Sequence, residues 1–282
     1  MDIALDAGFP KSTFKNNTTG ATITSPSFTV GGDTRTLVCV YTEYTSGNDP
    51  WPVSCAWVGG TPAAATAWVL RAWNAIDNGT DPNPNPTYSF TGDSTSGVDQ
   101  EETGGRHHTA RIWTSTWSGT PASASVVCTR TGTDNNTGSV NIYSFEGALT
   151  TFGKAGQHHS SSLEITNHTP GTIELPITAD ATGSVIVGGL YWGNAVGAAT
   201  ANGVTTIDYQ NNDGGAEGVT AAFRLTGTTT AGTQYTVGAT DSGWSWGVVA
   251  IEVLRDPYVG YGTAYDHSGV KPYSSLWRPA RA

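Results

Sequence analysis

Short apolar runs recur along this chain, and clusters of Gly, Asn, Asp and Pro separate them. In VNIYSF (140–145) apolar and polar positions alternate, so Val140 and Ile142 would share one face of a strand. VVAIEV (248–253) is almost continuously apolar, as expected for a central strand. Thr, Val, Tyr and Trp favour strands, and the separating residues favour turns. The pattern predicts an all-β protein, an antiparallel β-sandwich of jelly-roll-like type with long loops.

The strand-like runs also occur twice in the same order. Ile23 and Pro26 in ATITSPSFTV match Ile173 and Pro176 in GTIELPITAD. Three further segments then follow their counterparts in order: 35–44 with 183–192, 119–132 with 229–243, and 139–148 with 246–255. The repetition predicts two related halves, residues 1–150 and 151–257, and the short join between them favours one continuous body.

The first half contains an insertion of about 44 residues, located at about 45–110, because the offset between matching segments falls from 150 to 106. Within it, residues 66–76 fit either a strand or a short helix. Residues 77–108 have few apolar side chains and many turn residues. Loops of this length are uncommon in compact domains and usually bind something or are disordered, so this stretch is expected to be an exposed tip.

The charge of the chain argues against some partners. Its net charge of −10 comes from 13 basic and 23 acidic residues, which disfavours nucleic acid and anionic membrane surfaces. The opening stretch MDIALDAGFPKSTF lacks a secretory signal pattern, and no window has the length of a transmembrane helix. Folding in a cytosol is therefore expected.

The final segment, residues 258–282, differs from the rest of the chain. Three basic residues against Asp266 give it a net charge of +2, which leaves −12 elsewhere. Its large side chains would gain little in water but bury much area in pockets of a partner. We predict an extended C-terminal arm that contacts a partner through Tyr258, Tyr261, Tyr265, Tyr273, Trp277 and Arg278. The alternative is that the arm wraps the chain's own sandwich.

A search for catalytic motifs finds none that fits. Glu101 and Glu102 are adjacent, so they diverge and do not form a facing acid–base pair. The pairs His107–His108 and His158–His159 would point to opposite faces of a strand. Oxygen ligands for calcium at Asp77, Asp81 and nearby Asn residues match no known loop. No catalytic residue, cofactor or metal is predicted, and the chain is not expected to be an enzyme.

The cysteines and tryptophans have structural interpretations. Cys39, Cys55 and Cys128 are too few for a disulfide framework, and their spacing offers no zinc motif, so buried free thiols are expected. Six tryptophans lie in or beside the insertion, at 51, 57, 68, 73, 113 and 117. Core packing is the favoured interpretation, and stacking on glycans is the alternative.

Several segments together resemble β-sandwich proteins of tailed-phage structural modules: IALDA (3–7), RTLVCVYTEY (35–44), VSCAWVGG (53–60), IWTSTWSGTPASASVVC (112–128) and SFEGA (144–148). The resemblance covers roughly residues 1–255 and excludes the loop at 77–108 and the arm. It implies a virion protein without enzyme activity, first a capsid decoration protein and second a tail or neck fibre component. The implied partners are the major capsid protein or tail and neck proteins, and further copies of the chain in a homo-oligomer. Glycans are a further candidate partner, and a carbohydrate-binding module is the rival class.

The composition of residues 77–108 generates a first prediction. Limited proteolysis of the isolated protein should cleave first within this stretch, because it offers few apolar anchors. Mass mapping of the earliest fragments measures this. First cleavage within residues 171–254 would contradict the assignment of the second half.

Overall fold

The computed structural model describes residues 3–19, 22–31, 34–45, 53–77, 96–101, 107–130, 135–160, 172–193, 200–212, 219–240 and 245–257. Every regular element within these ranges is a strand, which confirms the predicted all-β class. In the same ranges there is no helix with the length and apolarity needed to cross a membrane.

The first half of the chain forms one large sheet and two small ones. In the large sheet the order is β1-β12-β5-β9-β7-β8, and β2 also pairs with β12. Its strands are β1 (Ala4–Leu5), β2 (Lys11–Thr19), β5 (Arg35–Thr45), β7 (Val69–Asp77), β8 (Ser96–Glu101), β9 (His107–Trp117) and β12 (Asn135–Glu146). The small sheets have the orders β3-β11-β6 and β10-β4, with β3 (Thr22–Thr24), β4 (Phe28–Val30), β6 (Val53–Trp57), β10 (Ala122–Ala124) and β11 (Val126–Arg130).

The second half forms one large and one small sheet. The large sheet has the order β13-β20-β15-β18-β17, and the small sheet has the order β14-β19-β16. The strands are β13 (Ala148–Ser160), β14 (Thr172–Thr178), β15 (Val185–Gly193), β16 (Thr200–Ala201), β17 (Thr205–Asn212), β18 (Val219–Leu225), β19 (Gln234–Thr240) and β20 (Ser245–Arg255).

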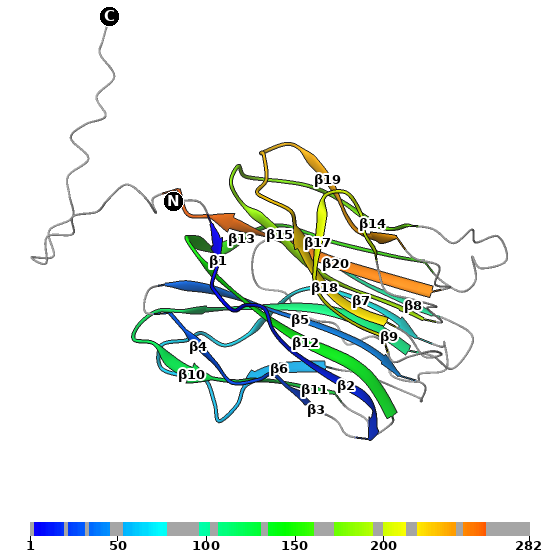
Figure 1. The fold of residues 1–282 in the computed structure, drawn as a ribbon, viewed down its shortest axis with the longest axis horizontal. Coiled ribbons are helices and arrows are strands. Elements are labelled where there is room, and N and C mark those ends of the chain that lie inside the picture. Colours follow the sequence, from blue (N-terminus) through cyan, green and yellow to red (C-terminus); the bar gives the residue numbers. More distant parts are fainter. Residues whose placement is uncertain are drawn as a thin grey trace, which may run out of the picture.

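The sheets stack in four layers (Figure 1), with the small sheets outside and the two large sheets inside. One apolar cluster fills the space between the first large sheet and its two small sheets. A second cluster fills the space between the second large sheet and its small sheet. A third cluster lies between the two large sheets and draws on both halves, including Val38, Val40 and Tyr143 from the first and Val187, Tyr191 and Val249 from the second. The two halves therefore share a core.

The central strands are buried on both faces, which explains why they carry apolar side chains on both. In β12, Val140 and Ile142 face the small sheets, whereas Tyr143 and Phe145 face the other half. The alternation in VNIYSF predicted one buried face, but here the polar Ser144 is also buried and donates to Asp6 Oδ2 at 2.6 Å. A polar residue in this run marks an internal hydrogen bond and not a solvent-facing position.

The two large sheets have equivalent strand orders. The order β1-β12-β5-β9-β7 in the first large sheet corresponds, strand by strand, to the order β13-β20-β15-β18-β17 in the second. The small sheet β3-β11-β6 corresponds in the same way to β14-β19-β16. The four matching sequence segments fall on β3 and β14, β5 and β15, β11 and β19, and β12 and β20. This agreement supports a duplication, while the limits of the two copies stay a prediction.

Two β-bulges lie at equivalent positions, and the bulged residue of each half contacts the other half. The register of β7 shifts at Arg71 and that of β17 shifts at Asp208. The Arg71 guanidinium lies 4.9 Å from the ring centre of Phe152 in the second half. Asp208 accepts hydrogen bonds from the Tyr143 hydroxyl of the first half at 3.2 Å and from Arg224 Nε at 3.1 Å. Each half thus contributes one bulged residue that contacts the other.

The insertion in the first half adopts more regular structure than its composition indicated. Residues 66–76, which fitted strand or helix, include most of β7. Within the stretch expected to be an exposed tip, residues 96–101 form β8, which pairs in parallel with β7. This pair departs from the predicted antiparallel arrangement. Residues 78–95 and 102–106 lie outside the described residues.

The contact between the large sheets is close at Gly189. A Cβ atom there would lie 2.4 Å from Val40 Cγ1 and 3.0 Å from Thr42 Cγ2 of the other half. We therefore expect Gly189→Ala to lower the free energy of unfolding by about 1–3 kcal/mol, because overpacking forces the sheets apart. Urea denaturation measures this change.

The matched control is Gly203→Ala, since a Cβ at Gly203 would meet nothing within 4 Å. Equal stability of the two variants would show that the sheets are not in close contact at Gly189.

Candidate functional site

The residues predicted to contact a partner lie outside the described residues. Tyr258, Tyr261, Tyr265, Tyr273, Trp277 and Arg278 all follow Pro257, the last residue described. Just after β20, the Asp256 N–H donates to the Gly147 carbonyl at 2.8 Å. The arm therefore stays a prediction from the sequence.

The acidic and histidine candidates are placed only in part. His107–His108 begin β9, and His158–His159 lie near the end of β13, where neighbouring residues alternate between faces. Asp77 ends β7 and Glu101 ends β8, while Asp81 and Glu102 lie outside the described residues. The side chains of these residues lie outside the described part of the structure, so the candidates stay untested.

The described tryptophans of the first half belong to the core. Trp57, Trp73, Trp113 and Trp117 are each 5% exposed or less. Trp68 is half-buried, and its ring centre lies 5.0 Å from that of Trp57. The four buried rings do not present their faces to a sugar, so the core interpretation holds for them, and Trp68 packs against the same core. Trp51 lies outside the described residues.

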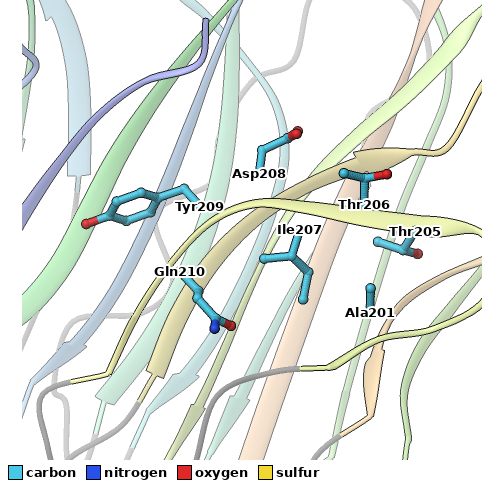
Figure 2. A pocket seen from close by; sticks show the side chains of 7 residues that line it. All are labelled: Ala201, Thr205, Thr206, Ile207, Asp208, Tyr209 and Gln210. Carbon is cyan, nitrogen blue, oxygen red and sulfur yellow. The ribbon is translucent and has the colours of Figure 1, made fainter.

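A shallow open depression of about 500 Å³ follows β17 and is lined by Ala201 and residues 205–210. Figure 2 shows Asp208 and Gln210 pointing to opposite sides of this strand. Asp208 is the one acidic residue of the lining, and burial raises its pKa although Arg224 and Tyr143 oppose the shift. Its carboxylate already accepts two hydrogen bonds, which fits a structural role at the bulge.

The three cysteines converge between the first large sheet and its small sheet. Their Sγ atoms all lie within 4.8 Å of one another, and those of Cys39 and Cys128 are 3.8 Å apart. Cys39 comes from β5, whereas Cys55 and Cys128 are paired across β6 and β11. Cys39 and Cys128 are buried and Cys55 is half-buried. We call these residues the cysteine cluster.

The environment of the cysteine cluster favours one thiolate. Burial raises the pKa of Cys39 and of Cys55. Burial also opposes ionisation of Cys128, but hydrogen bonds from Cys39 and Cys55 and the charge of Arg111 outweigh it and lower the pKa of Cys128 to about 5. A thiolate is the form of cysteine that binds metal ions and acts as a nucleophile.

Charged side chains are buried in the same layer. Arg130 Nε lies 3.3 Å from Glu43 Oε1, and both side chains are fully buried. The Tyr41 hydroxyl donates to Glu43, and burial together with that carboxylate raises the pKa of Tyr41. Arg111 is also buried, and its Nε donates to Thr109 Oγ1 at 3.1 Å. The interior of the first half is therefore more polar than an ordinary sandwich core.

Sequence reasoning correctly predicted buried thiols at Cys39 and Cys128 but missed that the cysteines form one group. Their spacing along the chain matches no metal motif, because the three sulfur atoms come from three strands in two facing sheets. The signal that could have found the group is that all three cysteines lie in strand-like runs of the first half, whereas the second half has none.

Comparison with family models, with curated proteins and with solved structures finds no match to this chain.

The buried ion pair generates a prediction. Glu43→Gln should lower the free energy of unfolding by about 3–5 kcal/mol, because the buried Arg130 guanidinium loses its carboxylate. Asp180→Asn is the control, since the Lys154–Asp180 pair is 52% and 42% exposed, and exposed pairs contribute less than about 1 kcal/mol. Chemical denaturation compares the two, and equal losses would contradict the strength assigned to the buried pair.

Proposed function

We propose that this protein is a non-enzymatic structural component of a tailed-phage virion, first a capsid decoration protein whose C-terminal arm docks on neighbouring subunits. The observation that supports this most is the four-layer body, in which both large sheets are covered on two faces and the halves share a core. A rigid body with a continuous core suits a structural component of a particle. The resemblance of residues 1–255 to phage structural β-sandwiches points to the same class.

The surface of the body supports attachment through another segment. Among the described residues the exposed large apolar side chains are Val58 and Val204, which lie in different halves. Stable interfaces need a buried apolar centre with aromatic or arginine anchors. Residues 258–282 supply four tyrosines, one tryptophan and two arginines, and their positive charge complements the acidic body. The arm is therefore the best candidate for contact with the capsid or with a second copy of the chain.

A tail or neck fibre component is the second candidate, and copy number separates it from the first. Quantitative mass spectrometry of purified virions should find hundreds of copies for a decoration protein and about six to a dozen for a fibre or neck part, because these positions have different symmetry. Absence from the particle would reject both candidates.

Deletion of residues 258–282 tests the role of the arm. The truncated body should stay folded and soluble but no longer sediment with undecorated particles, since each buried aromatic contributes roughly 1.5–3 kcal/mol to binding. Co-sedimentation and melting curves measure the two properties. If the truncated protein unfolds, the arm belongs to the chain's own core.

Point variants within the arm refine this experiment. Tyr273→Ala with Trp277→Ala should weaken co-sedimentation, whereas Ser274→Ala with Ser275→Ala, in the same segment, should leave it unchanged. Full binding by the aromatic double variant would contradict these residues as anchors.

A further inference from the structure

The packing of the fold does not require cysteine at the three cluster positions. Cys128 pairs with Ile23 on one side and with Cys55 on the other. In the second half, Ala239 pairs with Ile173 on one side and with Ala201 on the other. Because Ile23 and Ile173 are matched by the duplication, Ala239 and Ala201 are the equivalents of Cys128 and Cys55.

The third cysteine has an equivalent of the same kind. Cys39 pairs with Ile142 on β12, and Leu190 pairs with Val248 on β20. The offset that matches Glu146 to Glu252 also matches Ile142 to Val248. The second half therefore builds the same layer from one leucine and two alanines. All three cysteines of the chain nevertheless converge on the first half.

We propose that Cys39, Cys55 and Cys128 form a binding site for a thiophilic divalent ion of the zinc class, held by three thiolates. The Zn–S distance is about 2.3 Å, so two sulfurs on one tetrahedral ion lie about 3.8 Å apart. The sulfurs of Cys39 and Cys128 already have this separation, 3.8 Å. The third sulfur lies within 4.8 Å of both, so a small side-chain movement completes the set.

The chemistry of the cluster favours a soft cation over a hard one. Thiolate ligands select zinc and related ions, whereas magnesium and calcium require oxygen. Binding of the ion as a thiolate complex releases the thiol protons to solvent.

Cys55 is the half-buried member of the cluster and lies on β6, which ends the β3-β11-β6 order of its small sheet. The proposal therefore places the entry of the ion on this side, where water would supply the fourth ligand. Once bound, the ion links β5 of the large sheet to β6 and β11 of the small sheet. This site does not depend on the proposed role in a virion.

Titration of the reduced, metal-free, full-length protein with Cd²⁺ tests the site. The ultraviolet charge-transfer absorption between thiolate and Cd²⁺ should saturate at one equivalent, and Zn²⁺ should compete for the same site. Zn²⁺ should also raise the melting temperature, since a ligand that binds the folded state stabilises it. Binding by histidine or carboxylate alone produces no thiolate absorption.

Cys55→Ala and Cys128→Ala are the informative variants, because the second half carries alanine at both equivalent positions and the metal-free variants should fold. Each should lower the affinity for Zn²⁺ at least about 100-fold, beyond the loss typical of a residue outside the ligand set. Ser54→Ala is the matched control: Ser54 is the exposed neighbour of Cys55 on β6, and its variant should bind normally.

Three results would overturn the proposal. The first is the absence of thiolate absorption in the wild type at one equivalent of Cd²⁺. The second is unchanged Zn²⁺ affinity in Cys128→Ala. The third is a count of one free thiol in the denatured protein after purification under mild conditions, since this would show a disulfide between two of the three cysteines.

Discussion

The packing of the two large sheets against each other constrains the rest of the structure. Because one or two small sheets cover the outer face of each large sheet, the central strands are buried on both sides. Neighbouring residues such as Leu190 and Tyr191 are then both inaccessible to solvent. Polar groups in these strands must find partners inside the protein, since an unpaired buried group is costly. Thr42 and Ser139, for example, bond each other across β5 and β12 at 2.8 Å.

Close stacking also accounts for the paired glycines in VIVGGLYW. A Cβ at Gly188 would lie 2.3 Å from the ring of Phe223, and one at Gly189 would lie 2.4 Å from Val40. The first contact is on the face toward the small sheet, and the second is on the face toward the other half. Two adjacent glycines are therefore needed because both faces of β15 are crowded at the same point.

Local patterns were sufficient to predict an all-β chain, since the preference for strands depends on residues close in sequence. They were insufficient for burial: Glu252 in VVAIEV is fully buried, and its carboxylate accepts the N–H groups of Asp180 and Ala181 at 2.8 and 3.1 Å. They were also insufficient for the parallel pairing of β8, which depends on the path of a long insertion. The cysteine cluster depends on the register between two facing sheets, and no segment of the sequence encodes that register by itself.

The two halves show how one architecture tolerates different interiors. At equivalent positions the second half has Leu190, Ala201 and Ala239, and the first half has three thiols. Near these thiols the first half also buries Glu43 and Arg130. A buried ion pair often contributes less to stability than well-packed apolar side chains of similar volume. The core shared with the more apolar second half can offset this cost. The first half can therefore bury charged side chains and thiols that would destabilise an isolated sandwich more.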